Sequence, residues 1–442
     1  MEYAKDLKGL KTAFQRNPLG IDDLGSFYVS ETIEYRTGDK HNSPIRDIID
    51  GCMAPSLERN LASNYSNSYL LLGHQGCGKS TELNNMAVEL KKEGHPVRII
   101  SCFNDIDLVN PVFTDLLVLM GKAIYGLAND LGCDINSDMF RRLMSFWETE
   151  IEEKLTVADA KAISTDAGVK ANTPAFFAIL KAFTDISANI KFSKERQTTY
   201  KERIVPRASE WLAIVNEVAD IATRRSGGKQ PILIFEDIDK INPAAAWDIF
   251  SNNASILTGI AIPVIYTFPI ALYYDPRFDS LRGYYEYKTL PMIKIETIDG
   301  VEFSGGIETI KAIVNRRVEA SLFENGTLDV LIRKTGGSLR DLFECIVNCA
   351  TRAIRRESER IEHEDVNIAL VMLESSLTRR IEKKHYKFLA SINKGKKRNI
   401  DDTAMLLMMM QANAVLEYNS KSWYNTHPLV TDFLREIGEL QP

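Results

Sequence analysis

The chain has 442 residues, of which 45% are hydrophobic and 26% are charged, and its formal net charge is −6. This composition is typical of a folded protein with two or three domains, and it excludes both an intrinsically disordered chain and a basic protein that coats nucleic acid. The six cysteines include no C-x-x-C pair, which indicates neither disulfides nor a zinc site, and the lack of a long apolar stretch or of an apolar signal region at residues 1–6 predicts a cytoplasmic protein without membrane contact.

Residues 1–65 are expected to form an N-terminal extension, because short helix-like pieces are interrupted at Pro18, Gly20 and Gly25. Within the extension, the Phe-Tyr-Val run at 27–29 fits either an edge strand that packs on the core or part of a pocket for a purine ring. We favour the packing interpretation.

The most informative motif is the sequence GHQGCGKS at residues 73–80, which matches the phosphate-binding pattern G-x-x-x-x-G-K-[ST] at every required position. An apolar run at 69–72 predicts a strand before it, and apolar residues at helical spacing predict a helix over 80–92 after it. In such a loop, backbone N–H groups surround the phosphates, Lys79 neutralises the β and γ oxygens, and Ser80 is a hard oxygen ligand for Mg²⁺. The predicted nucleotide-binding residues are Gly73, His74, Gln75, Gly76, Cys77, Gly78, Lys79, Ser80 and Thr81.

Residues 66–300 are expected to form an α/β core around a mostly parallel sheet, because strand and helix patterns alternate along them. Further strands are predicted at 96–103, 232–235, 262–267 and, as a shorter candidate, 292–295. A helical stretch at 244–257 separates two of these strands. Residues 111–225 are helical over a length much greater than one crossover helix requires, so we interpret them as a helical insertion on which a partner could dock.

The strand predicted at 232–235 ends in two carboxylates, Glu236 and Asp237. The carboxyl ends of buried parallel strands are where open α/β sheets hold their ligands, and acids at this place can coordinate Mg²⁺ or activate water. Asp239 fits a strand-to-helix turn that precedes the helix beginning near Pro243. The sequence therefore predicts hydrolysis of a nucleoside triphosphate as well as its binding.

At these motifs the chain resembles the AAA+ superfamily and its STAND-like relatives, including ATPases encoded in prokaryotic antiviral defence loci. The resemblance implies a P-loop NTPase fold with ATP and Mg²⁺ as cofactors. It also implies that Glu236 joins Ser80 in the Mg²⁺ shell while Asp237 activates water. The usual order of the two acids is Asp followed by Glu, so which of the two activates water stays open.

The same resemblance suggests further catalytic residues. Thr267 occupies the place of a polar sensor of the γ-phosphate, although a strand threonine that faces the core is an equal alternative. Arg340, in the sequence GGSLRDL at 336–342, corresponds to a second sensor on a helical lid. Arg277 and Arg282 lie where an arginine finger that acts on an adjacent subunit is expected, and each of them also fits an ordinary surface arginine.

Residues 301–375 are expected to form the helical lid, and residues 376–442 a basic linker followed by a winged-helix-like domain. Between 376 and 400 the chain has nine basic residues and one acidic residue. A helix at 401–413, two short strands on either side of 419–421 and a final helix from 427 predict the winged-helix-like unit. The basic segment at 379–398 fits a DNA-phosphate contact, or equally a solvated linker.

Three functions stay open from the sequence. The favoured one is an ATP-hydrolysing switch that forms a homo-oligomer and regulates an effector protein, as the resemblance to antiviral ATPases implies. The second is a DNA-binding initiator or loader similar to the origin-recognition ATPases, and the third is a nucleotide-binding scaffold without turnover. ATP is preferred to GTP because the chain has no N-K-x-D element to read guanine.

Overall fold

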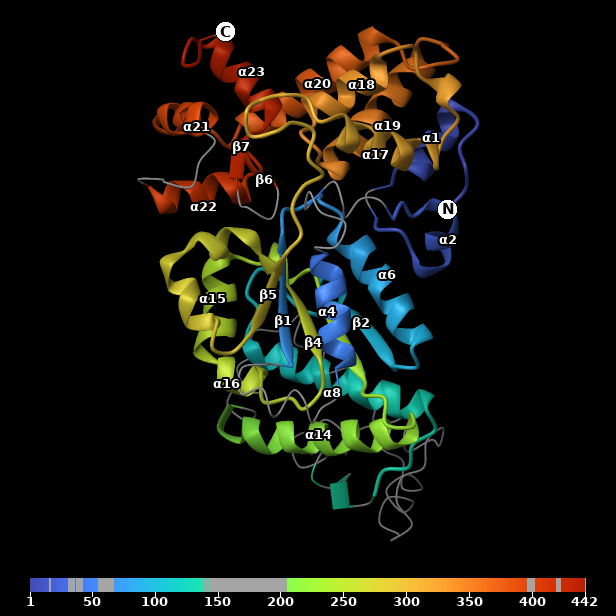
Figure 1. Cartoon of the computed structure of the whole chain (residues 1–442), viewed down its shortest axis with the longest axis vertical. Coiled ribbons are helices and arrows are strands. Elements are labelled where there is room, and N and C mark those ends of the chain that lie inside the picture. The colour runs from blue at the N-terminus through green and yellow to red at the C-terminus, as the bar shows by residue number, and fades with distance from the viewer. Residues whose placement is uncertain are drawn as a thin grey trace.

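The structure is a computed structural model that describes residues 1–15, 17–30, 36, 43–54, 67–136, 138–139, 142, 205–395, 402–418 and 423–441. Figure 1 shows a central sheet flanked by helices, with a group of helices at one end of the sheet and the C-terminal unit beside that group. The helices α8 and α14 lie at the opposite end.

Five parallel strands form the central sheet in the order β2-β3-β4-β1-β5. They are β1 (Ser68–Gly73), β2 (Val97–Ser101), β3 (Ile232–Glu236), β4 (Val264–Pro269) and β5 (Glu286–Thr289). Strands β1, β3 and β4 are buried along their whole length, which explains why their sequences are nearly uninterrupted apolar runs. The phosphate-binding loop joins β1 to α6 (Lys79–Lys92), and the predicted α/β fold of P-loop NTPases is therefore confirmed.

The fifth strand lies outside the range that the sequence predicted. The predicted strand at 292–295 is wrong, because Met292 forms only an isolated bridge with Tyr418. The fifth strand is instead β5, whose sequence EYKT is half-buried. An edge strand such as β5 is paired on one side only, so its residues need not be apolar and give no strand signal in the sequence.

Each face of the sheet carries its own helical layer, because successive side chains of a strand point to opposite faces. Leu70 and Leu72 of β1 belong to the core of the first face, whereas Tyr69 and Leu71 belong to the core of the second. The first layer consists of α8 (Phe113–Asp130), α14 (Ala208–Arg225), α15 (Pro243–Asn252) and α16 (Ala254–Leu257). The second layer consists of α4 (Pro44–Met53) and α6.

The helices α8 and α14 are the two described ends of the predicted helical insertion. Both pack on the sheet, and the indole N–H of the fully buried Trp211 donates a hydrogen bond to the carbonyl oxygen of Leu117 at 3.1 Å. The chain between them, from 143 to 204, lies outside the described residues. The insertion itself and its use as a docking region therefore stay predictions.

Four helices occupy the region predicted to form the helical lid, and part of the N-terminal segment packs with them. It consists of α17 (Ser304–Asn315), α18 (Thr327–Lys334), α19 (Leu339–Arg355) and α20 (His363–Thr378). The N-terminal helix α1 (Leu7–Ala13) shares their apolar core, and Ala4 forms backbone hydrogen bonds with Arg317 and Glu319. Within the described ranges, no helix combines the length and the apolar character that crossing a lipid bilayer requires.

The C-terminal unit consists of α21 (Lys383–Gly395), α22 (Thr403–Gln411), the antiparallel pair β6 (Val415–Tyr418) and β7 (Trp423–Thr426), and α23 (Pro428–Glu436). The helices and the two-stranded hairpin agree with the predicted winged-helix-like arrangement. The interpretation of the preceding basic segment as a linker is wrong for 383–395, because α21 buries His385, Leu389 and Ile392 and packs against β7 and α23.

Candidate nucleotide-binding site

The phosphate loop has the backbone shape that its glycines predict. Gly76 and Gly78 have φ angles of 88° and 98°, in the left-handed region that favours glycine. A Cβ atom at Gly76 would lie only 2.7 Å from the Cβ of Arg340, so this position also has no room for a side chain. The loop therefore presents its backbone to the space in front of α6, as phosphate binding requires.

Lys79 of the phosphate loop is a buried cation. Its ammonium group donates to the carbonyl oxygens of Gly73 at 2.7 Å and His74 at 2.9 Å, and it forms an ion pair with Asp239 at 2.9 Å. Burial alone would lower the pKa of Lys79, but the negative charge of Asp239 raises it above its ordinary value. Asp239, interpreted from the sequence as a turn residue, is thus a member of the phosphate site.

Glu236 ends β3 beside the helix that carries Ser80. Burial, with a further contribution from the charge of Asp237, raises the pKa of its carboxyl to about 7, although a hydrogen bond with Ser80 opposes this shift. The other oxygen, Oε1, is buried and has no hydrogen-bond partner among the described residues. An unpaired carboxylate oxygen next to a serine hydroxyl is a suitable donor set for Mg²⁺, which protein sites bind through one or two oxygens while nucleotide phosphates and water complete the shell.

Within the described part of the chain, no group of three or more His, Cys, Asp or Glu residues could hold a metal ion on its own. The roles of Ser80 and Glu236 as Mg²⁺ ligands stay predictions.

Asp237 differs from its neighbour in both its backbone and its partners. Its φ angle is 72°, and its carboxylate accepts hydrogen bonds from Ser101 at 2.7 Å and from Lys240 at 2.5 Å. Burial would raise the pKa of this carboxyl, but the two hydrogen bonds hold it below its ordinary value. The pKa values of the two adjacent acids are therefore shifted in opposite directions.

Thr267 lies at the end of β4 and is almost fully buried. Its hydroxyl accepts a hydrogen bond from the backbone N–H of Ile238 at 3.1 Å, directly after Asp237. The hydroxyl thus holds the turn that presents Asp237 and does not line the cavity in front of the loop. Its role as a sensor of the γ-phosphate stays a prediction.

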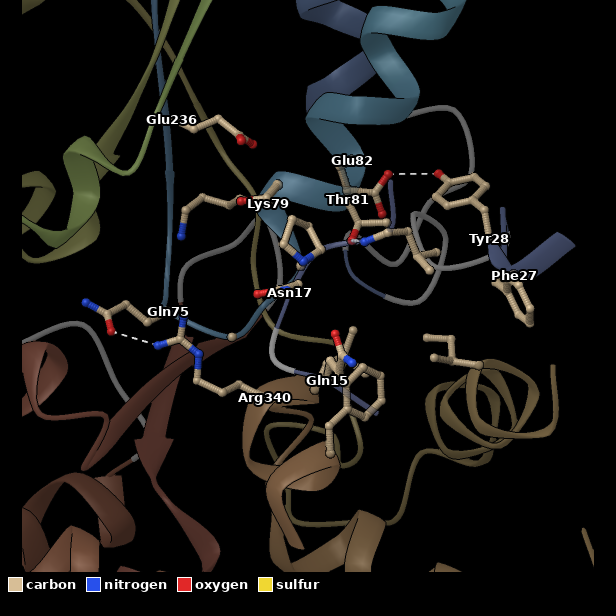
Figure 2. Close-up of a pocket in the computed structure, with 18 of the residues that line it drawn as sticks. Gln15, Asn17, Phe27, Tyr28, Gln75, Lys79, Thr81, Glu82, Glu236 and Arg340 are labelled. Carbon is tan, nitrogen blue, oxygen red and sulfur yellow. Dashed lines mark hydrogen bonds between the residues drawn. The ribbon is translucent and has the colours of Figure 1, made fainter. Parts of the chain in front are cut away.

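Arg340 reaches the phosphate loop from the first turn of α19. Its guanidinium donates to the side-chain oxygen of Gln75 at 3.0 Å, and the backbone N–H of Leu339 donates to the carbonyl oxygen of Gly76 at 3.1 Å. Figure 2 shows Arg340 and Gln75 on the same side of the cavity as Lys79. The first turn of α19 therefore contacts the phosphate loop, and the role of Arg340 as a second sensor stays a prediction.

The two candidate finger arginines lie away from the cavity of their own chain. Arg277 pairs with Asp275 at 2.6 Å and lies over the ring of Trp247. Arg282 pairs with Asp279 at 3.0 Å. Since a finger acts on an adjacent subunit, this placement in a single chain leaves the predicted role of Arg282 as a prediction.

The cavity in front of the loop has a volume of about 840 Å³. The run at 27–29 lines it together with the lid residues Ile313 and Phe343, and the hydroxyl of Tyr28 donates to Glu82 at 2.8 Å (Figure 2). The edge-strand alternative for this run is wrong, because Phe27 ends the short helix α2 (Leu24–Phe27). Phe27 and Val29 are buried, as the packing interpretation predicts, and they also line the cavity. A pocket for a purine ring at this run stays a prediction.

Two buried arginines also line the cavity and carry no motif that sequence reasoning could use. Arg36 lies 4.0 Å from Glu82, and its Nη1 donates to the carbonyl oxygen of Pro291 at 2.8 Å. Arg317, at the end of the first lid helix, donates to the carbonyl oxygen of Ile313. Burial lowers the pKa of Arg317 to about 10, which still leaves it charged. Arg36 and Arg317 therefore add two positive charges to those of Lys79 and Arg340 in a lining that also contains acidic side chains.

The remaining loop residues connect the site to its surroundings. His74 accepts a hydrogen bond at Nε2 from the backbone N–H of Glu417 in β6, at 2.9 Å. Burial and the charge of Lys79 lower the pKa of His74 to about 3, so the ring is neutral. Cys77 is fully buried, and the hydroxyl of Thr81 accepts a hydrogen bond from the N–H of Leu19 at 3.3 Å.

No family model matches the sequence, and no curated protein matches it. Solved structures with a similar fold include a Walker-type ATPase of Pyrococcus abyssi, paby2304, with 15% identity and a TM-score of 0.42 over 96% of this chain and 99% of that one. The ORC2 protein of Aeropyrum pernix, in ADPNP and ADP complexes, has 12% identity and a TM-score of 0.39, with 89% and 91% of the two chains covered. Cdc6p of Pyrobaculum aerophilum has 14% identity and a TM-score of 0.37, with 97% and 98% covered. The strand order β2-β3-β4-β1-β5 and the phosphate loop between β1 and α6 define the fold of this chain.

Proposed function

We propose that the protein is an ATPase switch of the AAA+ type that binds ATP with Mg²⁺ and hydrolyses it. The observation that carries this proposal is the convergence of three separate elements on one cavity: the loop with Lys79 and Ser80, the end of β3 with Glu236 and Asp237, and the lid with Arg340. Each of these supplies a component that phosphoryl transfer to water needs. The scaffold alternative explains the loop but not the two acids.

The side chains divide the chemistry between them. The glycine backbone and Lys79 hold the β- and γ-phosphates, and Arg340 contacts the same phosphates from the lid. When bound, Mg²⁺ supplies charge neutralisation at these phosphates, and Ser80 and Glu236 are the residues that would hold it. Asp237, which stays ionised because its pKa is lowered, orients the attacking water and accepts its proton.

The proposal extends to regulation of a partner. The lid and the C-terminal hairpin both bond directly to the phosphate loop, through Leu339 with Gly76 and Glu417 with His74. A change at the nucleotide can therefore pass to both units without a long chain of contacts. Assembly into a homo-oligomer that controls an effector protein, in antiviral defence as the sequence resemblance suggests, is the form of this function that we favour.

Three variants test the ATPase. Lys79→Ala should weaken ATP binding by about 2–3 kcal/mol, roughly 30- to 150-fold, because the charge-assisted contacts with phosphate are lost. Glu236→Gln and Asp237→Asn should still bind ATP but release phosphate far more slowly. The matched control is Lys91→Ala at the exposed end of the same helix. Unchanged binding and turnover in all three site variants would refute the proposed site.

DNA binding is a second candidate function, favoured by the surface of the C-terminal unit. Six of the nine basic residues between 376 and 400 lie within the described residues, and all six are exposed. They are Arg379, Arg380, Lys383, Lys384, Lys387 and Lys394.

If this surface binds DNA, the logarithm of affinity should fall with the logarithm of salt concentration by roughly 0.9 per phosphate contacted. The triple variant Lys383→Gln, Lys384→Gln, Lys387→Gln should flatten this slope. The triple variant Lys91→Gln, Lys92→Gln, Lys229→Gln, at three exposed positions outside the C-terminal unit, is the control for the same change in net charge. Salt-insensitive or absent binding of duplex DNA would eliminate this candidate.

A further inference from the structure

Every donor of the Lys79 ammonium group is already used within the protein. An ammonium has three N–H donors. Those of Lys79 point at the carbonyl oxygens of Gly73 and His74, at 2.7 and 2.9 Å, and at the Asp239 carboxylate, at 2.9 Å. No donor remains for a phosphate oxygen, so nucleotide binding requires Lys79 to give up at least one of these partners.

Asp239 is the partner with which a phosphate competes. The two carbonyl groups belong to the loop that itself surrounds the phosphates, whereas Asp239 lies on η3 (Ile238–Lys240), after β3. Its carboxylate and a phosphate oxygen are both anions that would occupy the same side of one ammonium group. Lys79 and Asp239 are only 6% and 7% exposed, so solvent screens neither their attraction nor the repulsion of a second anion.

We propose that Asp239 is a positioning residue that holds Lys79 in a retracted state and competes with the nucleotide phosphate for its ammonium group. This inference depends on the proposed nucleotide-binding function. In the protein without nucleotide, Asp239 compensates a buried positive charge that would otherwise be costly. When a nucleotide binds, its phosphate replaces the Asp239 carboxylate as a partner of the Lys79 ammonium group. When the product dissociates, the ion pair between Lys79 and Asp239 forms again.

If Asp239 competes with phosphate, Asp239→Asn should lower the unfolding temperature of the protein and raise its affinity for ADP. Asp239→Asn keeps the side-chain shape but removes the charge, so the protein without nucleotide should unfold at a lower temperature because Lys79 loses its counter-ion. The same variant should bind ADP about three- to tenfold more tightly, a difference of roughly 0.7–1.4 kcal/mol. A purely structural role for Asp239 would weaken folding and binding together.

The experiment is calorimetric titration of the full chain with ADP in the absence of Mg²⁺, together with thermal unfolding of each variant without nucleotide. Omitting Mg²⁺ keeps any metal contact of the acidic residues out of the comparison. Asp220→Asn, at an exposed position of α14, is the matched control and should leave both measurements unchanged. Asp239→Glu keeps the charge and should stay within about twofold of the wild-type affinity.

Two outcomes would overturn the inference while the wild-type protein still binds ADP: equal or weaker ADP binding by Asp239→Asn, or a gain in affinity for Asp239→Glu as large as that expected for Asn. If Asp239→Asn does not fold, the ADP affinity of Asp239→Glu tests the inference alone, and a roughly three- to tenfold gain in that affinity would overturn it. Failure of the wild-type protein to bind ADP would instead refute the proposed function on which this inference depends.

Discussion

Glu236 and Asp237 are adjacent in the chain and yet have opposite electrostatic surroundings. Burial raises the pKa of Glu236 to about 7, whereas hydrogen bonds from Lys240 and Ser101 overcome the effect of burial and keep the pKa of Asp237 low. A buried acid with a raised pKa binds its proton more tightly in the folded state than in the unfolded state. Stability therefore falls as pH rises from the unfolded pKa, near 4.5, to the folded value, and the loss is complete above it.

The fall in stability with rising pH that Glu236 causes leads to a prediction for Glu236→Gln. The neutral glutamine has no proton to lose, so the variant should gain stability over wild type between pH 5 and pH 8, by roughly 2–3 kcal/mol in the absence of nucleotide. Urea unfolding at the two pH values measures this difference. Glu93→Gln, at the exposed end of α6, is the control and should show no such pH dependence. A constant stability difference at both pH values would contradict the raised pKa.

The sequence predicted those residues whose roles follow from short motifs, and it missed those whose roles depend on tertiary contacts. Lys79 and Ser80 are recognisable from the phosphate-loop motif. Glu236 and Asp237 are recognisable because they end an apolar strand pattern. Nothing local distinguishes Asp239 from a turn residue, because its partner Lys79 is 160 positions away in the chain. The same is true of Arg317, which reaches the cavity only because the lid folds over it.

At the scale of elements, the lid and the phosphate loop approach each other closely at Gly76. Helix α19 begins at Leu339, directly after the N-cap residue Ser338, whose hydroxyl accepts a hydrogen bond from the N–H of Asp341. This first turn lies so close to Gly76 that a Cβ atom there would meet both Ser338 and Arg340. Secondary structure was predictable here because lid and core helices have regular apolar spacing, whereas the polar edge strand β5 has none.

Gly76→Ala tests this close approach. The substitution places a side chain at a φ of 88° and within 2.7 Å of Arg340, so it should cost roughly 1–3 kcal/mol in backbone strain and displace the start of α19. Nucleotide affinity and thermal stability should both fall. Gly25→Ala is the matched control, because a Cβ there has no neighbour within 4 Å. Equal effects of the two alanines would show that the lid does not depend on the loop.

At the scale of the whole molecule, the C-terminal unit is joined to both the core and the lid through β6. Glu417 bonds through its backbone to His74 of the loop and to Met292 of the core, and the hydroxyl of Tyr418 donates to the carbonyl oxygen of Gly336 at 2.8 Å. Leu416 and Tyr418 belong to the same apolar cluster as β1 and α6. The sequence predicted the helices and hairpin of this unit, but not where it docks, because its local patterns contain no information on docking.

Tyr418→Phe tests whether this docking is coupled to the nucleotide. The variant keeps the buried ring and removes one hydrogen bond, which leaves the Gly336 carbonyl without that donor and should cost about 1–2 kcal/mol. If the C-terminal unit is held in place through this contact, hydrogen exchange in β6 and β7 should become faster in the variant, and saturating ADP should restore less protection than it gives wild type. Tyr284→Phe is the control, since Tyr284 is 42% exposed and should change neither the exchange nor the effect of ADP. Exchange that is faster in the variant but equally protected by ADP would mean that docking is structural and carries no nucleotide signal.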